Sequence, residues 1–268
     1  DNYFYLYLFF ITFFSIVSQY LFKKIQQKEL HYSYLIIGVI VALVALLFVF
    51  TKMPELESEE ESKSNITIGS LLKRKHLVLG ILAQFLNLGA QVSLWGNFVD
   101  LKLDLAKNDN LWLVEKIYQI SDLMSPTQIA SFHASFAFII FLLGRFLGTY
   151  LMGKIASNKV LGVYAIGSVI SVIIAMFGGG LAALIALIAV YFFQSIMFPT
   201  IFALSCKGLG EGKKLASSLI IMSIVGGAII PPLTASLFKV STVAALSIPL
   251  VCFTYIIYYA YKGYEIKD

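Results

Sequence analysis

The sequence predicts an all-α, polytopic helical bundle that spans a membrane. Of its 268 residues, 59% are hydrophobic and only 13% are charged, and the mean hydropathy is +0.85. An ordinary soluble domain carries about 25% charged residues. The apolar residues also form continuous runs of about the length that a helix needs to cross a bilayer. Because these runs do not alternate with polar residues, they favour helices over a transmembrane β-barrel.

Eight apolar runs are long enough to be predicted as membrane-spanning helices. They cover residues 3–22, 33–51, 76–99, 129–153, 160–177, 181–205, 216–238 and 242–261. Most connections between the runs are short, and two are long. Residues 52–75 are rich in charge, and residues 100–128 contain scattered Leu and one Trp, so a short surface helix is expected there. The sequence thus predicts two helices, a charged loop and then six helices.

The distribution of basic residues predicts the orientation of the bundle. If residues 52–75 face the cytoplasm, twelve Lys and Arg residues lie inside and seven outside, with Arg145 uncounted inside a helix. Lys and Arg are enriched on the cytoplasmic side of membrane proteins. We therefore expect a multi-pass protein of the plasma (inner) membrane with a cytoplasmic C-terminus. The net charge of +5 is explained by this topology, and no nucleic-acid partner is expected.

No enzyme signature is present in the sequence. It contains no H-E-x-x-H, no G-x-S-x-G and no phosphate-binding P-loop. Its three histidines are far apart, and Cys206 and Cys252 fit the role of small buried hydrophobes. The sequence therefore predicts no catalytic residues, no metal site and no cofactor.

Polar residues form a stripe along the predicted helix 76–99. At about 100° per residue, one face holds Gln84, Asn87, Gln91 and Trp95. Polar side chains inside a span are costly, and they usually face a cavity or another helix. Three amides and an indole can hydrogen-bond hydroxyl groups and stack on a sugar ring. We therefore predict a substrate-binding surface, and interhelical hydrogen bonding is the alternative.

A proline interrupts the predicted helix 181–205 next to two polar residues. Pro199 has no N–H, so the carbonyl of Ser195 loses its helical partner. Gln194 and Ser195 lie at the same level, and a free carbonyl is tolerated where it faces protein or a water-filled path. We therefore predict that Gln194 and Ser195 line the substrate site. A kink that serves packing alone is the alternative.

Three further features predict moving or gating elements. The next helix contains Gly226 and Gly227, which allow close packing, and then Pro231 and Pro232. Successive interrupted helices are typical of transporter binding sites. Arg145 lies about two turns from the cytoplasmic end of helix 129–153, where it could either form a gate or snorkel to the interface.

The same stretches carry a resemblance to a known family. The segment from QSIMFPTIF through the GLG turn to GGAIIPPL resembles the tenth and eleventh helices of the fucose:proton symporter family, within the major facilitator superfamily. FLNLGAQVSLWGNFV looks like its seventh helix, GRFLG the end of its eighth, and TKMPEL the end of its sixth. The resemblance covers roughly residues 33–264.

The resemblance implies a bundle of the major facilitator type whose N-terminal four helices are missing from this sequence. Residues 1–52 would hold the last two helices of the N-terminal bundle, 53–75 the cytoplasmic central loop, and 76–268 the six-helix C-terminal bundle. The family's acidic coupling residues lie in its first and fourth helices. Its motifs often carry Glu where this sequence has Gln91, and Asn where it has Gln194.

The expected function is secondary active transport of a hexose of the fucose, glucose or galactose type. Proton symport with alternating access is favoured, with the sugar, the ion and the lipid bilayer as partners. A neutral Gln91 cannot take up a proton. An uncoupled or sodium-coupled sugar transporter or sensor, or an inactive truncated fragment, therefore remain alternatives.

Overall fold

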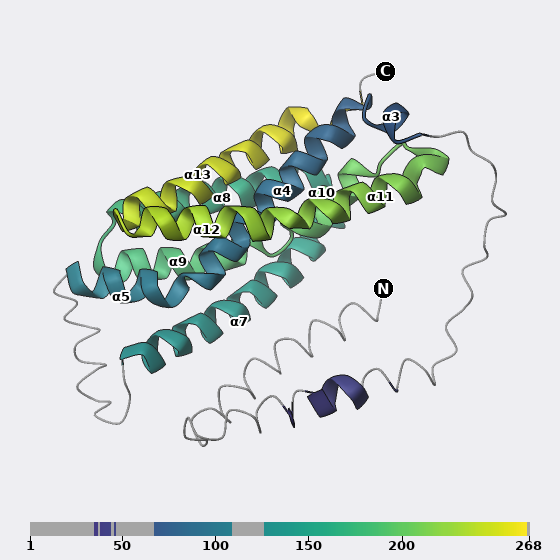
Figure 1. The fold of residues 1–268 in the computed structure, drawn as a ribbon. Helices are drawn as coiled ribbons and strands as arrows, with labels where there is room; N and C mark the ends of the chain where they lie inside the picture. The colour runs from purple at the N-terminus through teal and green to yellow at the C-terminus, as the bar shows by residue number, and fades with distance from the viewer. Residues whose placement is uncertain (1–34, 37, 44–45, 47–66, 109–125, 267–268) are drawn as a thin grey trace. The chain divides into compact units, whose positions relative to one another are not determined.

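The computed structural model describes residues 35–36, 38–43, 46, 67–108 and 126–266 (Figure 1). The chain divides into two compact units, residues 1–64 and 65–268. In the first unit the described residues are helical and lie within the predicted span 33–51. The predicted span 3–22 lies outside the described residues.

The described part of the second unit consists of helices and contains no strand, which confirms the predicted all-α class. It holds six helical segments that are long and apolar enough to cross a membrane, and they match the six runs predicted between residues 76 and 261. The helices are α3 (Ile68–Leu71), α4 (Lys75–Gly96), α5 (Phe98–Asn108), α7 (Pro126–Met152), α8 (Ser157–Phe177), α9 (Gly180–Gln194), α10 (Met197–Ser205), α11 (Lys213–Met222), α12 (Gly226–Phe238) and α13 (Thr242–Tyr258). Three short turns accompany them: η2 (Gly210–Gly212), η3 (Ser223–Val225) and the π-helical η4 (Tyr259–Gly263).

Two of the helix ends show why the chain turns where it does. Between α8 and α9, Gly179 and Gly180 have φ of 62° and 45°, values that favour glycine over other residues. At the start of α13, the Ser241 hydroxyl accepts a hydrogen bond of 3.0 Å from the Ala244 N–H and so caps the helix. Both signals keep the connections short and bring neighbouring helices side by side.

The span Gly180–Ser205 is made of two helices rather than one. α9 ends at Gln194, and α10 begins at Met197, so the interruption lies at Ser195 and Ile196. Pro199 is the third residue of α10, where a backbone N–H has no partner within its own helix. The break therefore precedes the proline by about one turn, and the proline fits into the new helix.

The predicted helix 76–99 is also divided. α4 ends at Gly96, and a second helix, α5, starts at Phe98. α5 continues to Asn108 and so enters residues 100–128, where a loop with a short surface helix was expected. Between them, both the backbone N–H and the side-chain amide of Asn97 donate to the carbonyl of Ser93, at 3.2 and 2.8 Å. A side chain that bonds the backbone in this way competes with helix continuation.

The core of the unit surrounds α4. α12 lies against one side of α4 (Figure 1), where a Cβ at Gly226 would overlap the carbonyl oxygen of Phe85. On the same side, a Cβ at Gly89 would overlap the side chain of Ile230. α13 also contacts α4, and its Tyr255 hydroxyl donates to the carbonyl of Leu79 at 3.3 Å. Small residues therefore let the helix backbones approach closely, as they do in membrane bundles.

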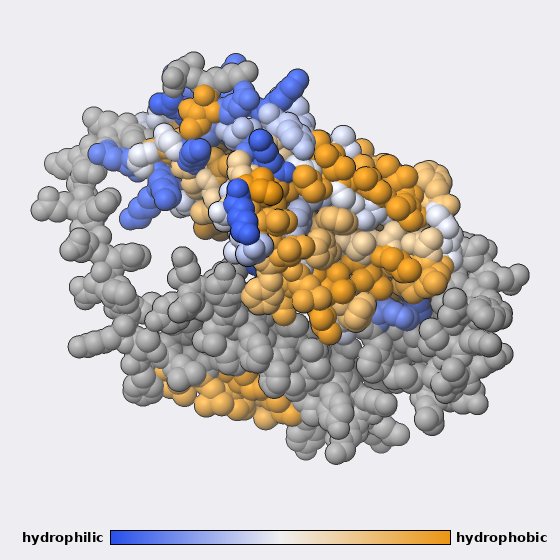
Figure 2. Space-filling view, turned by 180° about the vertical axis from the view of Figure 1, so that it is seen from behind, coloured by the Kyte–Doolittle hydropathy of each residue, from blue (hydrophilic) through white to orange (hydrophobic). Residues whose placement is uncertain are grey.

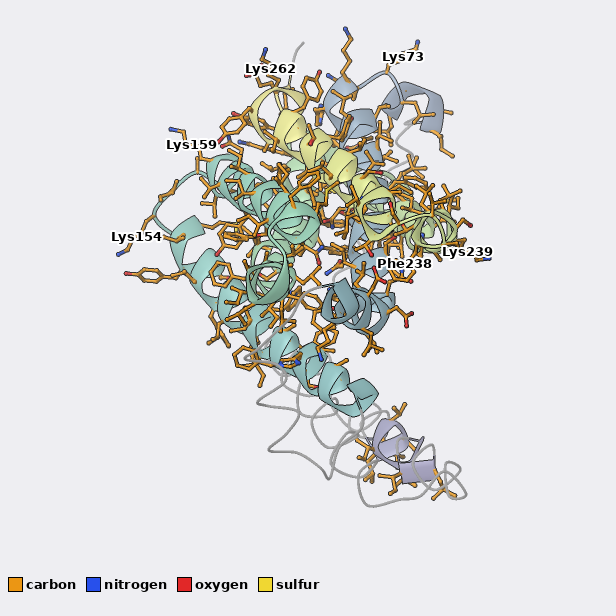
Figure 3. The ribbon with its side chains drawn as sticks, turned by 90° about the vertical axis from the view of Figure 1, so that its left-hand side faces the viewer. Lys73, Lys154, Lys159, Phe238, Lys239 and Lys262 are labelled. Atoms are coloured by element: carbon orange, nitrogen blue, oxygen red, sulfur yellow. The ribbon has the colours of Figure 1, made fainter. Side chains whose placement is uncertain are left out.

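Contacts between distant segments define the two ends of this unit. At one end, His76 Nε2 hydrogen-bonds the carbonyl of Lys207 at 3.1 Å, and the side-chain amide of Asn158 donates to Ala260 at 3.3 Å. This end carries nine basic residues in the described part: Lys73, Arg74, Lys75, Lys154, Lys159, Lys207, Lys213, Lys214 and Lys262. Figure 3 labels four of them, whose side chains point away from the helices. We call it the basic end.

The opposite end is formed where α5 meets the start of α13. The Thr242 hydroxyl donates to Asp104 Oδ2, and Phe98 and Leu101 of α5 are buried. The described side chains of this end include Lys102 and Lys239 together with Asp100 and Asp104. Among the described residues the charge is therefore balanced at this end and strongly positive at the basic end.

We expect Asp104→Ala to loosen α5 from the bundle. The substitution removes a charged acceptor, and hydrogen bonds to charged groups contribute roughly 1.5–3 kcal/mol. Amide hydrogen exchange of α5 should therefore become about tenfold faster or more, while exchange in α8 stays unchanged. In Asp104→Asn, which keeps an acceptor oxygen, the exchange rate of α5 should lie between those of the wild type and Asp104→Ala. Unchanged exchange in α5 would mean that the buried Phe98 and Leu101 hold this helix without the hydrogen bond.

Candidate functional site

The predicted polar stripe lies on one face of α4, and this face is buried. Gln84, Asn87 and Gln91 are 0%, 1% and 7% exposed, and Trp95 is partly buried. Ser93 lies roughly 180° around the helix from Gln84. Its hydroxyl accepts a hydrogen bond of 3.1 Å from Thr234 of α12. α4 therefore packs on α12 with one side and presents its amides on the other.

An aromatic cluster surrounds the end of this stripe that lies farther from the basic end. We use the name for Trp95, Phe98, Phe138, Phe141 and Tyr191. The Trp95 ring stacks on Tyr191 at 5.9 Å and meets Phe138 and Phe141 edge-on at 5.0 and 5.6 Å. Tyr191 also meets Phe98 and Phe138 edge-on, at 5.6 and 5.4 Å. The cluster joins α4, α5, α7 and α9, and edge-on aromatic pairs of this kind add to packing stability.

Gln194 extends the polar surface from α9. α4 begins at the basic end, and α10 finishes there, with Ser205 against Gly80, so α4 and α9 run in opposite directions. Starting from the stacked rings of Trp95 and Tyr191, one turn toward the basic end reaches Gln91 on α4 and Gln194 on α9. The amides predicted from two separate runs are therefore brought to the same level of the bundle.

Many of these buried polar atoms make no hydrogen bond with any described residue. They are both side-chain amide atoms of Gln84, Asn87 and Gln194, the indole nitrogen of Trp95 and the hydroxyl of Tyr191. A buried polar group without a partner costs about 1–3 kcal/mol. Native proteins keep few such groups, and each one calls for an explanation. Their concentration on the facing sides of α4 and α9 indicates a surface built to hydrogen-bond something other than its own helices.

Ser195, the other residue predicted to line the site from this segment, is engaged locally. It is 1% exposed, and its hydroxyl donates to the carbonyl of Phe192 at 2.7 Å. A Cβ at Gly144 of α7 would lie 2.8 Å from this hydroxyl oxygen. Tyr164 of α8 donates to the carbonyl of the same glycine at 3.0 Å. Ser195 thus forms part of a tight junction of α7, α8 and α9.

The predicted gating residues lie in two places. Arg145 is on α7, next to Gly144, and is partly buried. Gly226 and Gly227 open α12, where Gly226 meets the backbone of Phe85. Pro231 and Pro232, the predicted kink residues of this segment, lie inside α12. The helix continues through both prolines, and the tighter turn η3 stands just before Gly226.

Four members of the aromatic cluster were not predicted from the sequence: Phe98, Phe138, Phe141 and Tyr191. They lie in apolar runs, where aromatic residues are ordinary core residues. Tyr191 stands three residues before Gln194, and so on the same face of α9, which was a usable signal. For Phe138 and Phe141, only the packing of α7 against α4 and α9 reveals their position.

Hydrogen-bond donors and acceptors beside aromatic rings suit a ligand with hydroxyl groups and an apolar face. A primary amide both donates and accepts, so one Gln can bind two neighbouring hydroxyls. Aromatic faces pack against the C–H surface of a ring. The geometry therefore favours a small, neutral, polyhydroxylated ligand, held within a helical bundle that has the dimensions of a membrane-spanning protein.

Known proteins that are similar to this chain are named as transporters of sugars. No family model matches the chain. The chain is 35% identical over 237 residues to the L-fucose-proton symporter of Escherichia coli, covering 85% of this chain and 50% of that protein. It is 29% identical over 239 residues to a glucose/galactose transporter of Brucella abortus, covering 89% and 54%. The chain thus spans about half the length of the curated relatives it matches.

Solved structures show the same likeness in three dimensions. A crystal structure of FucP, a major facilitator superfamily transporter in the outward conformation, matches with a TM-score of 0.66 and 33% identity, over 86% of this chain and 53% of that one. The chain therefore has a fold of the major facilitator type, and its resemblance to the fucose:proton symporter family is confirmed. The relatives are named as transporters and not as enzymes, in agreement with the expectation from the sequence.

We expect Tyr191→Phe to separate ligand binding from stability. The substitution keeps the ring that stacks on Trp95 and removes a buried hydroxyl that has no partner among the described residues. The melting temperature should stay the same or rise, because an unpaired polar group disappears from the interior. The affinity for a hydroxylated ligand should fall by roughly fivefold or more, because the loss of one hydrogen bond costs about 1 kcal/mol of binding free energy. A lower melting temperature with unchanged affinity would assign the hydroxyl to the protein interior.

Proposed function

We propose that this chain is the sugar-binding half of a hexose transporter in the plasma (inner) membrane. The observation that carries the proposal is the set of buried, unpartnered amides of Gln84, Asn87 and Gln194 beside the aromatic cluster. The names of its relatives, a fucose symporter and glucose/galactose transporters, support a hexose as the substrate. In this proposal the amides bind the sugar hydroxyls, and Trp95 and Tyr191 pack on the ring.

We propose transport by alternating access, in which this bundle rocks against a second bundle around the sugar. Residues 76–268 would form the C-terminal bundle, 53–75 the cytoplasmic central loop, and 1–52 the end of the N-terminal bundle. The close contacts at Gly144 and Gly226 support rigid movement, because a bundle packed through helix backbones moves as one body. The excess of basic residues at the basic end supports a cytoplasmic location of that end and of the C-terminus.

Proton symport is the favoured form of coupling, on the name of the Escherichia coli relative. The six described spans contain a single carboxylate, Glu211, which is exposed in the loop before α11. A coupling carboxylate would therefore have to lie outside these spans. The same observation supports the second candidate function, a sodium-coupled or uncoupled sugar transporter, since the amides here are neutral at every pH.

Uptake measurements test these proposals. The complete protein that carries this sequence would be expressed in cells that lack hexose uptake, and labelled fucose, glucose and galactose supplied with and without a protonophore. Uptake of one sugar that the protonophore abolishes is the expected result. Uptake that survives the protonophore would replace proton coupling by the second candidate function. Absence of uptake, with the protein shown to be in the membrane, would overturn the proposed substrate class.

A further inference from the structure

A patch of exposed cations lies on the basic end, where two distant segments meet. We name it the inner basic patch: Lys73, Arg74, Lys75, Lys207, Lys213 and Lys214. All six residues are exposed. We propose that the inner basic patch binds the phosphate headgroup of an anionic phospholipid. This inference goes beyond the proposed function, and it requires that the chain spans a membrane, not that it carries sugar.

A small apolar core holds the two segments of the patch together. Leu71 of α3 and Leu77 of α4 are buried in one cluster with Leu209, Ala216 and Ile220 of the α10–α11 region. His76 Nε2 also hydrogen-bonds the carbonyl of Lys207 at 3.1 Å. The cations before α4 and those around the start of α11 therefore surround a common packed base and do not sit on independent tails.

Backbone geometry fixes the loop that carries Lys207. Gly208 and Gly210 have φ of 73° and 49°, in the left-handed region that favours glycine. The chain therefore turns back within a few residues, and α11 begins at Lys213 beside the loop. The acids that the structure describes at this end are Glu211 and Glu265, against nine basic residues. Among the described residues the positive charge of this end is therefore weakly compensated, and such a concentration of charge attracts an anion.

The apolar surroundings of the patch favour a lipid over a soluble anion. Ile68 and Leu72, beside Lys73, are 47% and 49% exposed, while Leu71 between them is buried. Exposed apolar side chains next to cations are typical of a segment that lies in the headgroup region of a membrane. Figure 2 shows hydrophilic side chains gathered at this end and hydrophobic ones over the flank of the bundle.

The position along the bundle favours the same ligand. α4 is a predicted span, and it begins at Lys75, so the patch stands at the level where hydrocarbon gives way to headgroups. Basic pockets between transmembrane helices on the cytoplasmic side are a known form of headgroup recognition. An acidic protein partner would explain the cations but not the exposed apolar side chains of Ile68 and Leu72.

Native mass spectrometry of the complete protein in detergent tests the proposal. Phosphatidylglycerol and phosphatidylcholine would be titrated separately, and the bound fraction of each measured. We expect the wild type to prefer phosphatidylglycerol, and Lys73→Gln/Lys75→Gln/Lys213→Gln to lower its affinity at least tenfold, since each basic residue near an anionic surface is worth roughly fivefold. The affinity for phosphatidylcholine should not change. Exposed positions are chosen so that folding is unaffected, and the melting temperature verifies this.

A second triple variant provides a control of equal charge. Lys154, Lys159 and Lys262 lie at the same end but outside the inner basic patch, and Figure 3 labels all three. Their replacement by Gln should leave the phosphatidylglycerol affinity within about twofold of wild type. A patch variant with Arg in place of Lys73, Lys75 and Lys213 should keep the wild-type affinity for phosphatidylglycerol.

Three results would overturn the proposal. An equal loss of phosphatidylglycerol affinity in both triple variants would show a general electrostatic attraction to the basic end rather than a binding site. Equal affinity for both lipids in the wild type would show that no anionic headgroup is recognised. Displacement of bound phosphatidylglycerol by millimolar inorganic phosphate, with no requirement for acyl chains, would assign the patch to a soluble anion.

Discussion

Gln194→Leu is expected to weaken sugar binding by about tenfold or more while leaving the protein at least as stable as the wild type. Both polar atoms of the Gln194 side chain are buried without a partner among the described residues, so the free protein loses no hydrogen bond when they are removed. In the proposed sugar complex, the variant would lose the hydrogen bonds from the amide to sugar hydroxyls, each of which contributes roughly 0.5–1.5 kcal/mol. Leu fills a similar volume, so packing at the end of α9 is kept.

Radiolabelled sugar binding to the purified complete protein and its melting temperature are the two measurements. Thr234→Val provides the control, because this hydroxyl is also buried but is hydrogen-bonded to Ser93 at 3.1 Å. The control should lower the melting temperature and leave the affinity for sugar unchanged. If Gln194→Leu behaved like the control, its amide would belong to the internal hydrogen bonding of the bundle.

Gly226→Ala is expected to destabilise the packing of α12 against α4 strongly. Its Cβ would overlap the carbonyl oxygen of Phe85, which belongs to the backbone of α4 and cannot rotate away. Overpacking of this kind costs typically about 1–3 kcal/mol, and more where the backbone must shift. The two helices would have to separate, and the contact between Gly89 and Ile230 would loosen with them.

Two other glycines, one on α12 and one on α4, provide variants with smaller expected losses of stability. A Cβ at Gly227 would lie 3.1 Å from Cγ2 of Val92, a side-chain atom, and a Cβ at Gly96 would meet nothing within 4 Å. The melting temperature in detergent should therefore fall most for Gly226→Ala, less for Gly227→Ala and hardly at all for Gly96→Ala. Equal melting temperatures would mean that α12 and α4 are not in backbone contact.

The sequence was sufficient for the spans of the second unit because hydrophobicity over about 20 residues decides where a helix crosses lipid. The stripe from Gln84 to Trp95 was also predictable, since a single helix fixes which of its residues share a face. The interruption near Pro199 was expected, but its place at Ser195 and Ile196 depends on how α7 and α9 pack together.

Features that depend on contacts between helices were not predictable from one sequence. Asn97 reads as part of a helix, yet its amide bonds Ser93 and separates α4 from α5. Phe138 is one of many aromatic residues in apolar runs, and its role follows from its contact with Trp95. The inner basic patch likewise joins residues more than a hundred positions apart, through the buried Leu71 and Ala216.

The two faces of α4 have a consequence for how relatives of this chain diverge. Assembly of the bundle depends on the side that meets α12, through Gly89, Ser93 and the backbone of Phe85. The amides of Gln84 and Asn87 stand on the other side and bind nothing among the described residues. In the proposed function, substitutions on that side would alter which ligand is preferred without removing a hydrogen bond from the described bundle. Selectivity and foldability can evolve as independent traits within a single helix.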